Sequence, residues 1–130
     1  MYALPAFSRS RWNFVAYQHG KAVFRSRASD LKPLLRYLRL GAEQRRGAVV
    51  YDKIVGRAAA LLLSLARPQR VCTPILSRGG QQVLERSGLA YVTRRRVKFI
   101  MGYTSQALCQ WEQLAKNKTA AAFLKLVKIT

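Results

Sequence analysis

The chain has 130 residues, half of them hydrophobic, which is enough for one domain with a buried core. Its 24 lysines and arginines against five acids give a formal net charge of +19, which attracts polyanions, chiefly RNA or DNA. The longest apolar run, 58–63, is too short to span a bilayer, and residues 1–12 lack the apolar core of a signal peptide. Cys72 and Cys109 form no metal-type pair, so we predict a cytoplasmic (intracellular) protein without disulfides and without a membrane partner.

The first predicted element is a β-hairpin over residues 12–25. Apolar residues alternate with others on both sides of the turn sequence 18–21. Within this turn, His19-Gly20 suits a two-residue connection in which both residues adopt positive φ. We therefore interpret the chain's only histidine as a turn residue, not as a metal ligand or a catalytic base.

The hairpin is followed by a predicted helix over residues 31–40. Ser29 or Asp30 is expected to cap its start, because their side chains can accept hydrogen bonds from free backbone N–H groups. Gly41 is expected to end the helix. The polar segment 42–47 is then predicted to be a loop.

The middle of the chain alternates buried strands with helices. Residues 48–51 are wholly apolar, as central strands are, and the helix predicted from Lys53 to Ala66 is apolar nearly all round. Residues 71–76 are predicted to form another buried strand, in which Pro74 argues against a long regular ladder. Ser77 is expected to cap the helix that follows, up to Arg86.

The segment 89–100 is β-branched, aromatic and basic. Three cations, Arg94, Arg96 and Lys98, alternate with other residues, so one face of the predicted strand carries a row of positive charges. This pattern is typical of an edge strand protected against aggregation and equally of a strand that contacts phosphates. Two helices are predicted to end the chain, over 104–116 and from Thr119 onward.

The expected order β-β-α-β-α-β-α-β-α-α favours a three-layer α/β/α fold around a mixed sheet. We predict a single domain over residues 1–130. Residues 1–11 would be an N-terminal extension of it, and residues 117–130 a C-terminal helical extension.

Three short motifs resemble a known family. The strand 49–51 runs into Asp-Lys-Ile-Val-Gly-Arg-Ala-Ala-Ala at 52–60, Ser77 begins a helix with Leu84-Glu85 near its end, and Cys-Gln-Trp-Glu occupies 109–112. With the order of elements, these motifs resemble the cytidine-deaminase-like superfamily, and more closely a metal-free bacterial branch of unknown function. The resemblance spans about residues 12–115. Members of that branch have Cys-Pro-Met-Glu at the last motif and are less basic. These differences indicate that this chain uses the same scaffold to bind a polyanion.

Zinc-dependent deamination is excluded by the residues themselves. That chemistry needs His-x-Glu at one helix start and Pro-Cys-x-x-Cys at another, to hold a zinc-bound water beside a proton-shuttling Glu. His19 has no Glu two residues on, and Cys72 and Cys109 are far apart in the sequence. We expect neither a metal nor a cofactor.

The pair Asp52-Lys53 is the first candidate site. Asp52 is expected to cap the helix start, while Lys53 in the first turn would be opposed by the helix dipole. Lys53 is either directed at an anion held over the helix start or merely extended into solvent. Gly56 would allow a backbone or a ligand to approach closely.

Further candidates follow the later strands. Ser77 and Arg78 stand at a second helix start, which could hold a phosphate or be simply capped. Cys109 and Glu112 share a helical face with Ser105 and Lys116. Because no histidine is placed to activate the thiol, we interpret Cys109 as structural.

Three functions are consistent with these observations. The first is a non-catalytic protein that binds RNA or another nucleic acid, as part of a ribonucleoprotein or a homo-oligomer, through the cations Arg45, Arg46, Arg94, Arg95, Arg96 and Lys98. The second is a protein or enzyme that binds a nucleotide or a phosphorylated small molecule at Asp52-Lys53. The third is a structural or oligomeric interaction domain.

Overall fold

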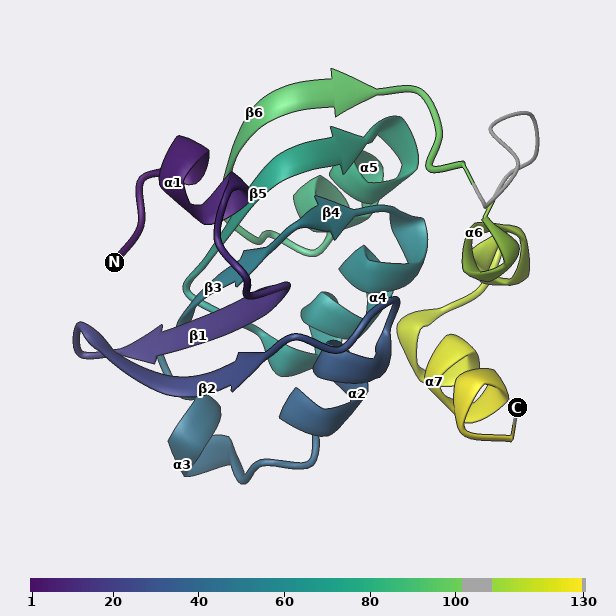
Figure 1. Ribbon diagram of the computed structural model, residues 1–130. Helices are drawn as coiled ribbons and strands as arrows, with labels where there is room; N and C mark the ends of the chain where they lie inside the picture. Colours follow the sequence, from purple (N-terminus) through teal and green to yellow (C-terminus); the bar gives the residue numbers. More distant parts are fainter. Residues whose placement is uncertain (102–108, 130) are drawn as a thin grey trace.

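A mixed six-stranded sheet forms the centre of the molecule (Figure 1). The computed structural model describes residues 1–101 and 109–129. In chain order the elements are α1 (Leu4–Ser8), β1 (Phe14–Gln18), β2 (Lys21–Ser26), α2 (Lys32–Tyr37), α3 (Ala42–Arg45), β3 (Val49–Asp52), β4 (Ile54–Val55), α4 (Arg57–Ala66), β5 (Arg70–Ser77), α5 (Arg78–Arg86), β6 (Tyr91–Val97), α6 (Gln110–Ala115) and α7 (Ala120–Ile129). None of the described helices is both long and apolar enough to cross a membrane.

The predicted hairpin is confirmed. Strands β1 and β2 pair in antiparallel fashion, and the turn residues have φ of +52° at His19 and +77° at Gly20. Both values lie in the left-handed region that a tight two-residue turn requires. The other edge of β1 pairs with β3, again antiparallel.

Strands β3, β5 and β6 are parallel to one another. The short strand β4 also pairs with β5, and its register continues that of β3, since Tyr51 lies opposite Cys72 and Ile54 opposite Ile75. Strand β4 is therefore an extension of β3 beyond a break at Asp52 and Lys53. The break lies opposite Pro74, which has no N–H to donate to a neighbouring strand.

This extension corrects the predicted start of the central helix. The helix was expected from Lys53 but begins at Arg57, because Ile54 and Val55 are held in the sheet by β5. Asp52 consequently ends a strand and does not cap a helix. Pro74 also does not shorten β5, which spans eight residues and pairs on both edges.

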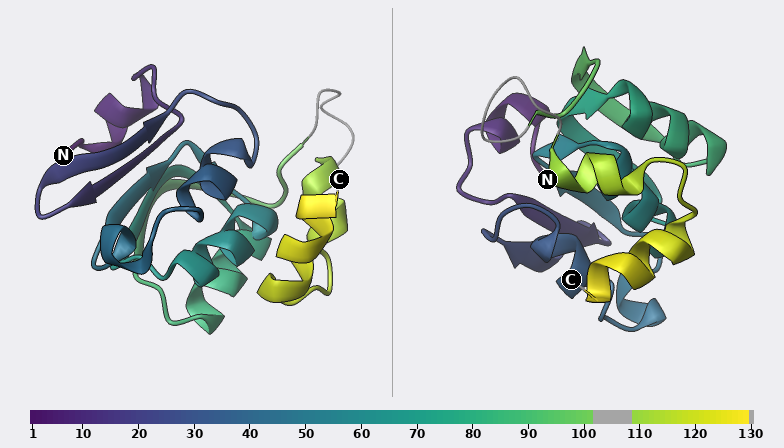
Figure 2. Two further views of the ribbon diagram at one scale, coloured as in Figure 1. Left: turned by 90° about the horizontal axis from the view of Figure 1, so that it is seen from below. Right: turned by 90° about the vertical axis from the view of Figure 1, so that its right-hand side faces the viewer.

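The main core lies on one face of the sheet, where α2, α4, α5, α6 and α7 pack (Figure 2). Helices α4 and α5 share this face because right-handed crossovers that proceed in one direction across a sheet place their helices on the same side. A smaller cluster on the opposite face joins Phe7 to Val15, Tyr51 and Cys72. Among the described residues, α1 is the one helix that contributes a buried side chain there, so the second helical layer is limited to this short helix.

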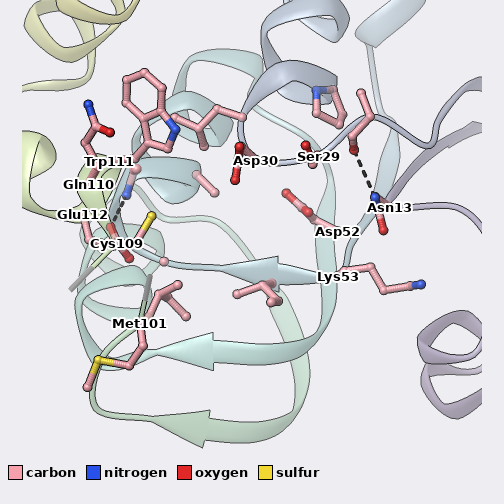
Figure 3. Close-up of a pocket in the computed structure, with 18 residues that line it drawn as sticks. Asn13, Ser29, Asp30, Asp52, Lys53, Met101, Cys109, Gln110, Trp111 and Glu112 are labelled. Carbon is pink, nitrogen blue, oxygen red and sulfur yellow. Dashed lines mark hydrogen bonds between the residues drawn. The ribbon is translucent and has the colours of Figure 1, made fainter. Parts of the chain in front are cut away.

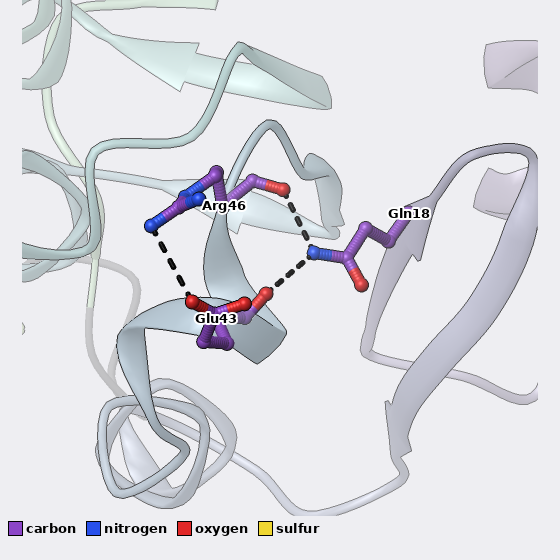
Figure 4. Close-up of polar contacts among 3 residues, drawn as sticks. All are labelled: Gln18, Glu43 and Arg46. Carbon is purple, nitrogen blue, oxygen red and sulfur yellow. Dashed lines mark hydrogen bonds and ion pairs between the residues drawn. The ribbon is translucent and has the colours of Figure 1, made fainter.

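The segment after the hairpin also differs from the prediction. Asp30 has φ of +59°, and neither Ser29 nor Asp30 caps α2 through its side chain. Gly41 does not end that helix but precedes α3, in the segment predicted to be a loop. Helix α3 is tied to the end of β1, because the Gln18 side-chain amide donates to the carbonyls of Glu43 (2.8 Å) and Arg46 (2.9 Å) (Figure 4).

The later elements agree with the sequence more closely. The Ser77 hydroxyl accepts a hydrogen bond from the Gly80 N–H at 2.9 Å and caps α5 as predicted. Strand β6 pairs only with β5 in the described part of the chain, so it is an edge strand. Of the helix predicted over 104–116, the structure describes α6, while residues 102–108, including Ser105, lie outside the described residues.

Candidate functional site

Two adjoining cavities open at the carboxyl ends of the parallel strands. The larger has a volume of about 670 Å³ and lies between the ends of β3 and β4, the segment 28–33 and the start of α6 (Figure 3). The smaller, of about 160 Å³, lies at the starts of α4 and α5 and the end of β6. Ile100 and Glu112 line both cavities. This edge of the sheet is where open α/β folds bind their ligands.

Glu112 joins α6 to the start of α4. Its two carboxylate oxygens accept hydrogen bonds from the backbone N–H groups of Arg57 (2.7 Å) and Ala58 (2.8 Å). Burial raises the pKa of Glu112, while these two hydrogen bonds and the Arg57 charge oppose the increase. Glu112 thus acts as the N-terminal cap of α4, although it is distant in sequence.

Gly56 permits this cap. It precedes α4 and provides no side chain of its own to bond the free N–H groups. A Cβ atom at this position would overlap the Glu112 carboxylate. The close approach expected at Gly56 therefore occurs, and the approaching group is a carboxylate of the same chain.

Asp52 lines the larger cavity, with its side chain directed into it (Figure 3). Burial raises the pKa of this carboxyl to about 8, and hydrogen bonds from the N–H groups of Ile54 and Lys53 limit the increase. Most Asp52 side chains are accordingly protonated near neutral pH and can donate a hydrogen bond to a ligand. Asp30 also lines this cavity.

Lys53 is turned away from Asp52. Its ammonium group donates to the Ser10 carbonyl at 2.7 Å and lies 5.3 Å from the centre of the Phe7 ring. Successive residues of an extended chain point to opposite faces, which separates the two side chains (Figure 3). Lys53 therefore fastens the N-terminal segment to the sheet and does not face an anion over the start of α4, as one interpretation required.

Cys109 is the residue immediately before α6 and lines the larger cavity. The chain's only histidine, His19, lies in the hairpin turn, so no imidazole is available to activate the thiol. Among the described residues, no group of three or more His, Cys, Asp or Glu side chains is placed to hold a metal ion.

Asn13 and Trp111 are among the polar and aromatic residues of the larger cavity that sequence reasoning missed. Asn13 donates from its side-chain amide to the Ala28 carbonyl at 3.1 Å and so connects the hairpin to the cavity wall. Trp111 lies on the wall formed by α6. No sequence motif near Asn13 indicates that it lines a cavity. Trp111 lies inside the Cys-x-x-Glu segment and could have been named as a candidate site residue.

Four cations line the smaller cavity: Arg57, Arg78, Lys98 and Lys116. Arg78 and Lys98 were predicted candidates, at a helix start and on the basic strand respectively. The side chain of Ser77, also a candidate, is used to cap α5. Arg57 and Lys116 were not predicted to contact a ligand, although Arg57 lies inside the motif 52–60 and Lys116 shares a helical face with Cys109 and Glu112.

The predicted nucleic-acid contacts fall into two separate groups. Arg94, Arg95 and Arg96 are exposed on β6, whereas α3, which ends at Arg45 and is followed by Arg46, lies far from β6 in Figure 1. In that second group, Arg45 donates from Nε to the Leu40 carbonyl at 3.0 Å. Arg46 forms an ion pair with Glu43 at 3.6 Å, where both side chains are highly exposed and the interaction is weak (Figure 4).

Comparison with known proteins identifies relatives without identifying an activity. The family described as "TM1506: Domain of unknown function (DUF1893)" matches residues 3–128. A crystal structure of a DUF1893 family protein (TM1506) from Thermotoga maritima is similar, with a TM-score of 0.85 and 23% sequence identity over 97% of this chain and 85% of that one. This likeness shows a shared fold. None of the curated proteins matches the chain.

Proposed function

Since the chain belongs to the TM1506 family of domains of unknown function (DUF1893), we propose from its own residues that it binds RNA or a similar polyanion and catalyses no reaction. The observation that carries this proposal is the excess of cations over acids on the surface. At neutral pH the folded protein carries even less negative charge than its composition suggests, because burial raises the pKa of Asp52 to about 8 and most Asp52 side chains are protonated. Asp30, Glu43, Glu85 and the Glu112 carboxylate remain to offset the lysines and arginines.

Strand β6 is the contact surface that we propose. Arg94, Arg95 and Arg96 are consecutive, exposed and free of ion pairs within the described part of the chain. The planar guanidinium group of arginine matches phosphate oxygens in a two-pronged geometry, which favours binding to a phosphodiester backbone. The backbone carries no base information, so the expected binding has little sequence preference.

We also propose that the scaffold is a cytidine-deaminase-like fold without zinc. Support comes from the antiparallel hairpin followed by three parallel strands, and from the Asp52-Lys53 pair at the end of β3. Cys72 faces the small cluster beneath α1 and Cys109 lies near the opposite cavity, so the two thiols do not converge. Such a scaffold would work as part of a ribonucleoprotein or a homo-oligomer.

A charge-matched comparison tests the proposed surface. The variant R94Q/R95Q/R96Q removes three exposed cations from β6, and the control K32Q/R36Q/R39Q removes three exposed cations from α2 and the residues just after it. Affinity for a fluorescent single-stranded RNA is measured for both by anisotropy at one salt concentration. We expect at least a tenfold loss for the β6 variant and a smaller loss for the control. Equal losses would contradict a role for β6, and absence of binding by the unmodified protein would contradict the whole proposal.

The larger cavity favours a second candidate, the binding of a small molecule. Its volume of about 670 Å³ lies in the range of ligand sites, and the carboxyl of Asp52 can donate a hydrogen bond inside it. Thermal denaturation with a panel of nucleosides and nucleotides tests this candidate, because a ligand that binds only the folded state raises the melting temperature. A shift that is lost in Asp52→Asn supports the cavity, and the absence of any shift contradicts it.

A further inference from the structure

We propose that the smaller cavity is a binding site for a phosphate monoester, held by Arg57, Arg78, Lys98 and Lys116. The inference rests on the proposed function, since the phosphate would be carried by an RNA end or by a nucleotide. It adds a discrete site to what is otherwise a broadly basic surface.

The fold brings these cations together by a repeated arrangement. Strands β4, β5 and β6 are neighbours in the sheet, and a cation follows the end of each one: Arg57, Arg78 and Lys98. Lys116 enters from the end of α6, which Glu112 fixes against α4. All four line one cavity of about 160 Å³.

The cations have little negative charge beside them. Glu112 is the single acid that lines the cavity, and both of its oxygens already accept backbone hydrogen bonds. Arg57 donates from Nη2 to the neutral side chain of Gln82 at 2.9 Å. In the residues that the structure describes, none of the four cations forms an ion pair. Their mutual repulsion is relieved when an anion enters between them.

The size and charge of the site favour a terminal phosphate. The cavity is smaller than the roughly 300 Å³ at which drug-sized ligand sites begin, so it suits one small group, and its four cations favour a phosphoryl group over a neutral nucleobase. A phosphate monoester carries about −1.5 to −2 charges at neutral pH, against −1 for each diester of a nucleic-acid backbone. The remainder of the ligand can extend past Ile100 toward the larger cavity or along β6.

The experiment compares ligands that differ only in the terminal phosphate. One short RNA is prepared with a 5′-monophosphate and with a 5′-hydroxyl, and AMP is compared with adenosine; inorganic phosphate is the competitor. The protein is used as the full chain and as the variants R78Q/K98Q and R36Q/R39Q, which lose the same charge. We expect about a tenfold preference for the phosphorylated RNA, retained by R36Q/R39Q and lost by R78Q/K98Q.

The outcomes separate the site from the general function. Preference for AMP over adenosine as well as for phosphorylated RNA identifies a site for any monoester, and preference for the RNA alone identifies an RNA end. Equal affinity for the two RNAs, together with equal affinity for AMP and adenosine, overturns the inference while RNA binding stands. If neither RNA binds, the proposed function fails, and the AMP comparison alone then decides whether the site exists.

Discussion

Replacing Asp52 with asparagine should change how the free energy of unfolding depends on pH. The pKa of Asp52 is about 8 in the folded protein, against about 4 in an unfolded chain, so between these values only the folded state holds the proton. The stability from this group is full below about pH 4 and is lost as the pH rises through about 8. A fully effective shift corresponds to about 1.4 kcal/mol per pH unit. Because Asp52 keeps some contact with solvent, the pH window over which this slope applies is narrower than full burial would give.

Asparagine keeps an acceptor for the N–H groups of Ile54 and Lys53 but does not ionise in this range. Urea denaturation of both proteins at pH 5, 6, 7 and 8 gives the two pH profiles. The variant should gain about 3 kcal/mol relative to the unmodified protein between pH 5 and pH 8. Glu112, whose pKa is also raised, is present in both proteins and cancels in this difference. Parallel profiles would refute the reasoning, because they would show that Asp52 ionises normally in the folded state.

Three substitutions test other contacts by thermal denaturation followed by circular dichroism. Gly56→Ala should destabilise the fold by roughly 2 kcal/mol, because the new methyl group displaces Glu112 from its two charge-assisted hydrogen bonds. A loss of stability below about 0.5 kcal/mol would contradict this packing. Tyr37→Phe should be neutral or stabilise the fold by up to about 1 kcal/mol, since the buried Tyr37 hydroxyl has no hydrogen-bond partner among the described residues. A clear loss of stability would show that this hydroxyl does form a hydrogen bond. Ser77→Ala should destabilise by about 1 kcal/mol through loss of the α5 cap, and an unchanged melting temperature would show that the cap contributes nothing.

The parts of the fold that were predicted correctly depend on local signals. His19-Gly20 adopts positive φ within its own turn, and Ser77 accepts a hydrogen bond from a residue three positions later. Each preference is set by a few neighbouring residues and is visible in the sequence. Asn117, which lies between the two helices predicted at the end of the chain, has φ of +57°, a conformation that asparagine adopts more readily than most residues.

The errors depend on contacts between distant parts of the chain. Ile54 and Val55 are apolar enough for either a strand or a buried helix, and their pairing with β5 decides between the two. How many helices each face carries could not be predicted from the order of elements, because the face on which a helix packs depends on the direction in which the strands are added.

The candidate site was predicted in part for the same reason. Asp52, Gly56 and Glu112 all line the larger cavity, as their positions near strand ends and on one helix suggested. Their roles were not predicted: Glu112 caps α4, and Lys53 extends to the other face of the sheet. Arg57 could not be identified from its surroundings, because its importance comes from three cations supplied by other elements.

The dependence of RNA affinity on salt tests the central claim most directly. Affinity of the full chain for a single-stranded RNA is measured from 50 to 400 mM monovalent salt. Each phosphate contact on a single strand lowers log K by about 0.7 per unit of log salt concentration, so six contacts predict a slope of about −4. A steep negative slope is the result that the proposed polyanion-binding surface predicts. No binding at 50 mM salt, or an affinity that does not change with salt, would contradict it.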